Sequence, residues 1–259
     1  MEYTLITGAC GGLGKEFCRQ LVGTDNLFLT GRSEEKLKAL REELLAEKSD
    51  AEIICLKADL TREEERKAIF DYADRENIKF SGLINVAGAD IQKEFSKYTP
   101  EKVTFQARLN FEAAVCLAHG VISRRAEKLK ILTVSSLCGI MPMPYFALYS
   151  ATKAALINFF TALRYEVKDA KITVLAPGGV PTRADVIEDI KKQGISGRLS
   201  SKPAAFVVKK ALKGLRRNKR LVIPGLFNKF TNFIQKLVPT AVKCRVMSGR
   251  WKKKEKDAF

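Results

Sequence analysis

A short β-rich run at residues 3–7 leads directly into a glycine-rich turn and then into a helical pattern at residues 15–22. The turn reads GACGGLG, so its glycines have the spacing G-x-x-x-G-x-G and not G-x-G-x-x-G. Glycines let the backbone approach a pyrophosphate closely, and the amides that open the next helix stabilise its charge. A glycine-rich loop alone is a weak signal, but between a strand and a helix it favours phosphate binding. The residues predicted to form this cradle are Gly8, Gly12, Leu13 and Gly14.

The same alternation of β-rich runs and helical patterns continues along the chain. Further β-rich runs lie at residues 26–30, 53–56, 82–86, 131–134, 171–176 and 220–223. The helical patterns between them lie at residues 34–48, 63–75 and 100–128, and in a segment that ends near residue 167. Strands that alternate with helices predict an α/β fold with a doubly wound parallel sheet and helices on both faces.

The ends of the second and third predicted strands indicate which dinucleotide is bound. A dinucleotide without a 2′-phosphate usually meets a carboxylate after the second strand. This chain has Gly31 and then Arg32, and a guanidinium suits a phosphate dianion. NADP(H) is therefore favoured over NAD(H), although Arg32 could instead lie on a solvated helix start. Asp59 and Leu60 follow the third strand, where they would meet the adenine ring.

Tyr149 and Lys153 lie four residues apart in a helical pattern, so they share one face of a helix. A phenol has a pKa of about 10, and a nearby ammonium lowers that value, which suits Tyr149 to proton transfer. Ser136, in the loop after the strand at 131–134, could hold a substrate oxygen against the phenol. Taken alone, the pair also fits a core tyrosine and a solvated lysine, because Tyr-x-x-x-Lys is short and common.

Other polar residues narrow the chemistry. Asn110 is an amide among apolar neighbours in the 100–128 helix, where it has a structural role or holds a water. The six cysteines show no CxxC pair and are expected to be reduced core thiols. His119 is the only histidine. A chain with a single histidine cannot form a multi-histidine metal site, and it is a poor fit for a Ser-His-Asp hydrolase. No metal is predicted.

These residues together resemble the short-chain dehydrogenase/reductase family over about residues 3–225. The resemblance rests on motifs that occur in the family's order and at its spacings: Thr7-Gly8-x-x-x-Gly12-x-Gly14, Asp59-Leu60, Asn85-x-Ala87-Gly88, Asn110, Ser136, Tyr149-x-x-x-Lys153 and Pro177-Gly178 with Thr182. Val86 departs from the family, which more often has a second asparagine there.

The resemblance implies a Rossmann-type sheet of about seven strands and a homodimer or homotetramer. It implies NADP(H)-dependent interconversion of a ketone and a secondary alcohol, with Asn110, Ser136, Tyr149 and Lys153 as the catalytic set. Cofactor contacts are implied for the glycine-rich turn, Arg32, Tyr149 and Lys153, and for Asp59, Leu60, Asn85, Ala87, Gly88, Pro177, Gly178 and Thr182. In this scheme Tyr149 donates the proton, Ser136 binds the substrate oxygen, and Lys153 lowers the Tyr149 pKa and binds the ribose. Asn110 holds a water.

Basic charge is concentrated in the C-terminal part of the chain. The formal net charge is +17, and residues 203–259 hold 16 Lys/Arg against 2 acids. Residues 226–238 place apolar side chains on one helical face, Pro239 ends that helix, and a basic segment follows. We divide the chain into a catalytic domain, 1–225, and an amphipathic basic extension, 226–259.

Three interpretations of the extension are open. It is a helix over the substrate site or against a dimer partner, a membrane-surface helix, or a nucleic-acid-binding segment, for which no motif is found. Nucleic acid is not expected as a partner. The segment 183–202 is predicted to be a lid loop that is flexible through Gly194 and Gly197.

The apolar extension favours a hydrophobic ketone or alcohol as the substrate, of the steroid or long 3-oxoacyl type. Family members that resemble this chain in having such an extension are hydroxysteroid dehydrogenases and 3-oxoacyl reductases. A small polar carbonyl and a non-catalytic dinucleotide-binding scaffold or redox sensor are the alternatives. The chain enters a strand at once and has no apolar run near the roughly 20 residues needed to span a bilayer. A cytoplasmic location with peripheral membrane contact is therefore expected.

Overall fold

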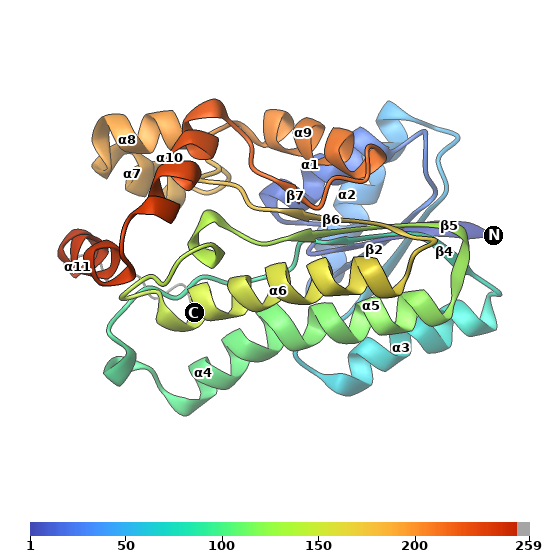
Figure 1. Ribbon diagram of the computed structural model, residues 1–259. Helices are drawn as coiled ribbons and strands as arrows, with labels where there is room; N and C mark the ends of the chain where they lie inside the picture. The colour runs from blue at the N-terminus through green and yellow to red at the C-terminus, as the bar shows by residue number, and fades with distance from the viewer. Residues whose placement is uncertain (253–259) are drawn as a thin grey trace.

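The predicted α/β architecture is confirmed in the computed structural model, which describes residues 1–252 except for the side chains of residues 185 and 189. Seven parallel strands form one sheet in the order β3-β2-β1-β4-β5-β6-β7 (Figure 1). The strands are β1 (Glu2–Thr7), β2 (Leu27–Gly31), β3 (Ile53–Lys57), β4 (Lys79–Asn85), β5 (Arg125–Val134), β6 (Lys171–Leu175) and β7 (Leu221–Val222).

Helices cover both faces of this sheet (Figure 1). One face carries α1 (Gly12–Leu21), α2 (Glu34–Glu47) and α9 (Ala204–Arg216). The other carries α3 (Glu63–Arg75), α4 (Pro100–Ala107), α5 (Ala113–Ser123) and α6 (Ala147–Glu166). Short turns of other helix types are η1 (Phe95–Lys97), η2 (Arg108–Glu112) and η3 (Leu137–Gly139).

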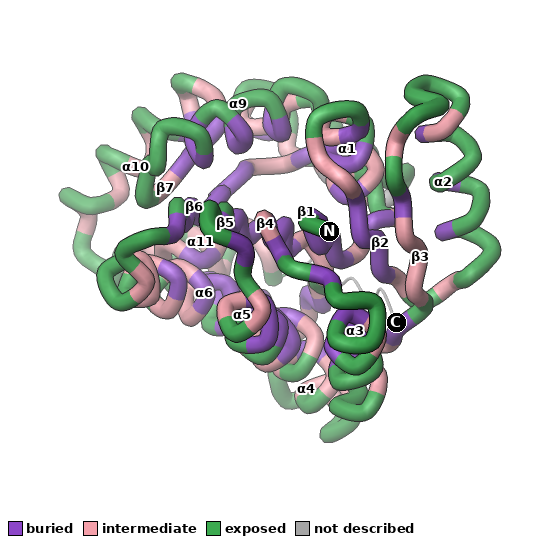
Figure 2. Tube along the Cα trace, turned by 90° about the vertical axis from the view of Figure 1, so that its right-hand side faces the viewer, coloured by how far each residue is buried: buried purple, intermediate pink, exposed green. Residues whose placement is uncertain are grey.

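Each central strand buries side chains on both faces, which is why the runs are almost continuously apolar. In β1, Leu5 packs into the core beneath α3, α5 and α6, while Ile6 packs beneath α1, α2 and α9. In β5, Ile131 and Leu132 divide between the same two cores. The end-on view shows the buried strands between the two helical layers (Figure 2).

The prediction of one helix over residues 100–128 is wrong at its end. The helix ends at Ser123, and β5 begins at Arg125, which pairs with Phe80 of β4. Residues 125–130 are mostly charged and alternate with the buried Ala126 and Leu129. That pattern resembles an amphipathic helix, but here the charges lie at the strand's solvent-exposed start.

The predicted lid loop at residues 183–202 is also wrong, since most of it is helical. It forms α7 (Ala184–Lys192) and α8 (Gly194–Ser200). Gly194 has φ +62° and opens α8. A Cβ on Gly197 would lie 2.4 Å from the Ile190 carbonyl oxygen, so this glycine permits close helix packing and is not a hinge.

The extension contains the predicted helix, α10 (Leu226–Leu237), and a second helix that the sequence did not predict, α11 (Thr240–Trp251). Pro239 caps α11 at its start as well as ending α10. Residues 253–259 of the predicted extension lie outside the described part of the chain. Among residues 1–252, no helix is long and apolar enough to cross a bilayer.

All six cysteines are free thiols, as expected. Their assignment to the core holds fully only for Cys18, which is buried between α1 and the sheet. Cys116 is exposed on α5, so its assignment to the core is wrong.

Candidate active site

The order of the strands changes direction at β1, and the carboxyl ends of β1 and β4 flank the crevice that results. Gly8 follows β1 with φ +59°, a conformation that side chains other than glycine rarely adopt. A Cβ there would also lie 3.0 Å from the Ala87 backbone, which belongs to the turn after β4. The glycine therefore lets the two turns touch at the head of the crevice.

A cavity of about 650 Å³ runs along the carboxyl edge of the sheet from β3 to β4. It is lined by the residues that open α1, by the ends of β2 and β3, by the turn after β4, and by Thr182 and Arg183. Of the predicted cofactor residues, the lining includes Gly8, Gly12, Leu13, Gly14, Arg32, Asp59, Leu60, Ala87, Gly88 and Thr182. Bare glycine backbone at the start of a helix suits a phosphate group, so the cavity fits a dinucleotide.

The end of β2 brings two cations to this cavity. Arg32 and Lys36 both line it, and Ser33 lies between them as the N-cap of α2. The Lys36 backbone N–H donates to Ser33 Oγ at 3.2 Å, which fixes the first turn of the helix. The sequence prediction named Arg32 and missed Lys36, although the spacing of three to four residues on a capped helix could have indicated it.

Asp59 and Asn85 play different parts. Asp59 lines the cavity, and its carboxylate accepts from the Thr61 backbone N–H at 3.0 Å and from the Thr61 hydroxyl at 2.8 Å. Asn85 does not line it: the side chain donates to the Ala114 carbonyl at 3.1 Å and accepts from the Thr7 hydroxyl at 3.2 Å. Asn85 thus stabilises the turn after β4 without lining the cavity.

The loop after β6 lies on the glycine-rich turn. A Cβ on Gly12 would lie 2.3 Å from Thr182 Cβ, so glycine is required for this approach. Pro177 and Gly178 precede this contact and do not line the cavity. A Cβ on Gly178 would meet the Ser200 carbonyl oxygen at 2.6 Å, so this glycine allows α8 to approach β6.

Ser135 and Ser136 follow β5 but serve different purposes. Ser135 is buried, and its hydroxyl donates to the Lys153 carbonyl at 2.8 Å, which fixes α6 against the strand end. Ser136 is partly exposed, caps η3 by accepting from the Cys138 backbone N–H at 3.1 Å, and hydrogen-bonds the Tyr149 phenol. The structure therefore brings Ser136 and Tyr149 together, as predicted.

Lys153 lies beside this pair on α6. Its Nζ donates to the Val134 carbonyl at 2.9 Å and lies 5.8 Å from the centre of the Tyr149 ring. Burial lowers the pKa of Lys153 to about 8, against the opposing charges of Asp90 and Cys138. A Cβ on Gly88 would lie 3.1 Å from this Nζ, so the amine reaches the dinucleotide cavity at Gly88.

The expected lowering of the Tyr149 pKa by Lys153 does not appear. Burial raises the pKa of Tyr149 above its ordinary value, the Cys138 and Asp90 charges add to the rise, and the Ser136 hydrogen bond opposes it. The reason is geometric: the lysine ammonium is directed at the Val134 carbonyl. The phenol is accordingly protonated at neutral pH.

Asn110 lies in η2, a turn of π-helix that interrupts the helical run between α4 and α5. It is fully buried, and its amide donates to the Ala89 carbonyl at 2.8 Å and accepts from the Ala89 N–H at 2.7 Å. A third bond runs to Thr152 Oγ1 at 3.3 Å. Gln106 also donates to the Ala89 carbonyl, at 3.2 Å. Asn110 therefore fixes the turn after β4 against α6, next to Lys153.

An ion pair that the sequence did not predict closes one side of the site. Arg183 lies 3.2 Å from Asp90, so the loop after β6 is joined to the turn after β4. Both charges affect the pKa of Tyr149: the Asp90 carboxylate raises it, and the Arg183 guanidinium lowers it. The two residues are 93 positions apart in the chain, and no local pattern connects them.

A second, mostly apolar cavity of about 540 Å³ adjoins the site on the side of the extension. It is enclosed by residues of the loop after β5, α8, α10 and α11, including Leu137, Met143, Phe227, Val238 and Trp251. An aromatic series connects it to the tyrosine. The Trp251 ring meets Phe146 edge-on at 5.3 Å between centroids, and Phe146 lies 5.8 Å from Tyr149.

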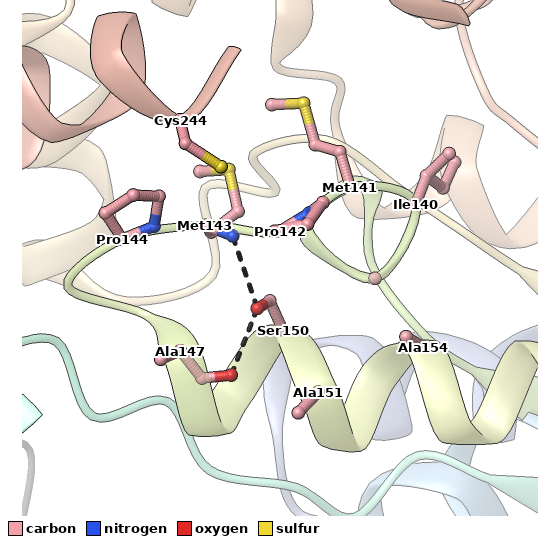
Figure 3. Close-up of a pocket in the computed structure, with 11 residues that line it drawn as sticks. Ile140, Met141, Pro142, Met143, Pro144, Ala147, Ser150, Ala151, Ala154 and Cys244 are labelled. Atoms are coloured by element: carbon pink, nitrogen blue, oxygen red, sulfur yellow. Dashed lines mark hydrogen bonds between the residues drawn. The ribbon is translucent and has the colours of Figure 1, made fainter. Parts of the chain in front are cut away.

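A third hollow of about 500 Å³ lies between the loop 139–144, α6 and Cys244 of α11 (Figure 3). In it the Ser150 hydroxyl accepts from the Met143 N–H at 3.4 Å and donates to the Ala147 carbonyl at 3.1 Å. These bonds hold the loop on the helix. Ser136, Tyr149 and Lys153 line neither this hollow nor the other two cavities. Met141 and Met143 line both this hollow and the apolar cavity.

The fold and the site define a dinucleotide-binding oxidoreductase, and comparison with known proteins assigns the family. Residues 2–192 match the family model described as short chain dehydrogenase. The chain belongs to the short-chain dehydrogenase/reductase family, whose members bind a nicotinamide dinucleotide and act on carbonyl or alcohol substrates.

Three similar proteins illustrate this relationship. An 11-beta-hydroxysteroid dehydrogenase-like 2 protein of Arabidopsis thaliana is 28% identical over 93% of this chain and 79% of its own length. The structure of a short-chain dehydrogenase from Sphingobium yanoikuyae in complex with NADPH has a TM-score of 0.75, with 25% identity over 100% of both chains. A 7beta-hydroxysteroid dehydrogenase structure has a TM-score of 0.84, with 24% identity over 95% of this chain and 96% of its own.

Proposed function

We propose that this protein is an NADP(H)-dependent oxidoreductase that interconverts a ketone and a secondary alcohol on a hydrophobic substrate of the steroid or long 3-oxoacyl type. The observation that carries the proposal is the position of Ser136, Tyr149 and Lys153. None of the three lines either cavity, but each cavity reaches a neighbour of this group: Gly88, which lines the dinucleotide cavity, lies next to the Lys153 Nζ, and Leu137, next to Ser136, lines the apolar cavity.

The dinucleotide cavity supports the cofactor part of the proposal. Arg32 and Lys36 supply two positive charges at the end of β2, and Gly31 stands where a ribose-binding carboxylate would be expected. A guanidinium and an ammonium favour a 2′-phosphate over a free hydroxyl. When bound, the cofactor would supply or accept a hydride.

The remaining chemistry belongs to the chain's own residues. A carbonyl oxygen placed between the Ser136 hydroxyl and the Tyr149 phenol accepts a hydrogen bond from the first and a proton from the second. The ordinary pKa of a phenol is about 10 and burial raises that of Tyr149 further, so at neutral pH the phenol holds the proton that it donates in reduction. Lys153, with a pKa near 8, lies beside the phenol on α6 and next to Gly88 of the dinucleotide cavity.

The apolar cavity supports the substrate class. Just over half of its lining residues are apolar, among them methionine, phenylalanine, valine and tryptophan, and its volume of about 540 Å³ is in the range of drug-sized ligand sites. The hydroxysteroid dehydrogenase-like relative from Arabidopsis has a name that points to the same class of compound.

The test is a spectrophotometric screen of NADPH and NADH oxidation with three sets of carbonyls: oxosteroids, long-chain 3-oxoacyl thioesters, and small polar ketones and sugars. The proposal predicts turnover with NADPH and a kcat/KM that is highest in the first or second set. Turnover restricted to the third set would exclude the hydrophobic substrate. Tight dinucleotide binding without turnover of any set would favour a non-catalytic scaffold or redox sensor.

A further inference from the structure

The two sides of α10 face different surroundings. One side covers the apolar cavity with Phe227, Asn228 and Gln235. The opposite side carries Leu226, Phe233 and Leu237, whose exposed fractions are 82%, 61% and 72%. These positions recur at the spacing of one helical face. A helix of a soluble domain normally turns such a stripe toward the core, so an outward apolar stripe marks an interaction surface.

The exposed stripe continues around the mouth of the apolar cavity. Phe230 and Ile234 of α10 and Val242 and Val246 of α11 line that cavity and are also exposed to solvent. The cavity therefore opens between the two helices. We define the docking face as the exposed apolar residues of both helices: Leu226, Phe230, Phe233, Ile234, Leu237, Val242 and Val246. Both helices lie at the same end of the molecule as α7 and α8 (Figure 1).

The charge around the docking face has one sign. Residues 226–252 contain six Lys/Arg and no Asp or Glu. Lys229 and Lys236 of α10, Arg245 of α11 and Lys252 are exposed. Lysines that flank an apolar helical face match a surface with anionic groups outside and apolar material beneath, which describes an anionic bilayer.

A second copy of the chain fits this face less well. A two-fold contact places the same surface on both partners, so cations would lie against cations with no carboxylate of residues 226–252 to pair with them. Like charges brought together across an interface are destabilising. Nucleic acid matches the charge but not an exposed row of phenylalanine and leucine.

We propose that the α10–α11 docking face binds the surface of an anionic membrane. Its apolar side chains enter the interface and its lysines meet the headgroups. One consequence rests on the proposed function. Because the mouth of the apolar cavity lies in this face, a lipophilic substrate dissolved in the bilayer enters the cavity between Phe230 and Val246 without crossing water.

Vesicle co-sedimentation of the full chain tests the docking and requires no substrate. The probes are phosphatidylcholine vesicles with and without phosphatidylserine, in low salt and at about 1 M salt, where the Debye length is about 3 Å. The wild-type chain should bind the anionic vesicles at low salt, less at high salt, and only weakly to the neutral ones. Failure to bind anionic vesicles at low salt would overturn the proposal.

Paired variants locate the contact. Phe233→Glu places a charge in the docking face and should lower vesicle partitioning at least about tenfold, because its ring no longer enters the interface. Tyr165→Glu makes the same change in charge at an aromatic residue of α6 that is 69% exposed, and should leave partitioning unchanged. Lys229→Gln and Lys236→Gln should each lower it about fivefold, the contribution expected for one basic residue near an anionic surface.

Two controls keep the outcomes distinct. Cofactor affinity and the thermal midpoint of Phe233→Glu should match those of the wild type, since this residue lies outside the dinucleotide cavity. Equal losses in Phe233→Glu and Tyr165→Glu would mean that another surface binds the membrane. Sedimentation velocity without lipid tests the remaining alternative, a subunit interface. If the wild type is a dimer that does not bind vesicles, and Phe233→Glu makes it a monomer, this face is a subunit interface and the proposal is overturned.

Discussion

The dinucleotide cavity and the apolar cavity are built in different ways. The dinucleotide cavity is formed by strand ends and the turns that follow them, so the sheet itself fixes its shape. The apolar cavity is formed by α8, α10, α11 and the loop after β5, which come from distant parts of the chain. The first is lined by glycine backbone, three cations and several apolar side chains, and the surface of the second is mostly apolar. The difference implies that substrate preference can change while the cofactor site stays the same.

The largest effect is expected at Tyr149. Tyr149→Phe removes the proton donor but keeps the ring against Phe146, so turnover should fall at least about 100-fold, the lower end of general acid–base contributions. Cofactor and substrate affinities should change little. Steady-state kinetics and cofactor titration measure both quantities. Tyr165→Phe, the same change at an exposed position of α6, is the control. A Tyr149→Phe protein with most of its turnover would refute the assigned role.

The next change acts on the dinucleotide cavity alone. Arg32→Ala should weaken NADPH binding by roughly ten- to hundredfold, since a charge-assisted hydrogen bond contributes about 1.5–3 kcal/mol. NADH binding and the KM of the carbonyl substrate should stay nearly constant. Lys36→Ala should have a smaller effect in the same direction. Lys38→Ala, at a lysine of α2 paired with Glu34, should have none. Equal losses for both cofactors would show that Arg32 is structural.

A smaller effect is expected in the pH dependence of stability. Burial lowers the pKa of Lys153 from 10.5 to about 8. Between these values the unfolded chain still binds the proton that the folded chain has lost, so this residue's contribution to the free energy of unfolding rises with pH. The rise is at most about 1.4 kcal/mol per pH unit. Below pH 8 the amine is charged in both the folded and the unfolded chain, so its desolvation lowers the free energy of unfolding by an amount that does not change with pH.

Urea unfolding of the cofactor-free protein between about pH 7 and pH 10 measures this contribution. In Lys153→Met the rise is absent, so the wild type should gain stability relative to the variant as the pH increases through 8. Several cysteines have raised pKa values. They are the same in both proteins, so the comparison with the variant removes their contribution to the pH dependence of stability. Parallel stability profiles for the two proteins would mean that Lys153 is not desolvated in solution.

The smallest effect is expected in the apolar cavity. Trp251→Ala removes the ring that meets Phe146 edge-on, and an aromatic pair contributes about 0.5–1.5 kcal/mol beyond the area it buries. The kcat/KM for hydrophobic carbonyls should fall about fivefold, with NADPH affinity unchanged. Tyr165→Ala is the matched control. A loss of NADPH affinity in Trp251→Ala would mean that the two cavities are not independent.

The sequence predicted the dinucleotide cavity better than the apolar one, for a physical reason. The glycine-rich turn, Arg32 and the Tyr149–Lys153 pair each depend on neighbours within a few residues, so spacing alone indicates them. The Asp90–Arg183 ion pair and the enclosure of the apolar cavity depend on how distant segments pack. The prediction about Asn85 illustrates the limit: its position was right, but its side chain supports the turn from behind instead of lining the cavity.

Errors in secondary structure had a similar origin. Charged residues at the start of β5 continued a helical pattern, and only pairing with β4 at Phe80 makes them a strand. Glycine in the segment after Thr182 suggested flexibility, but Gly197 packs against the Ile190 carbonyl. The direction of the Tyr149 pKa shift could not be predicted, because it depends on the burial of the phenol and on where the Lys153 ammonium is directed.

The contact between Gly12 and Thr182 bears on how cofactor binding affects substrate binding. Thr182 lies against the glycine-rich turn, and α7 begins two residues later. Thr182 also lines the dinucleotide cavity, and the same segment leads through α7 and α8 to the wall of the apolar cavity. A dinucleotide held at Thr182 would therefore act on the segment that leads to the substrate side, so the cofactor should alter the affinity for the carbonyl substrate, which equilibrium titration with and without cofactor measures.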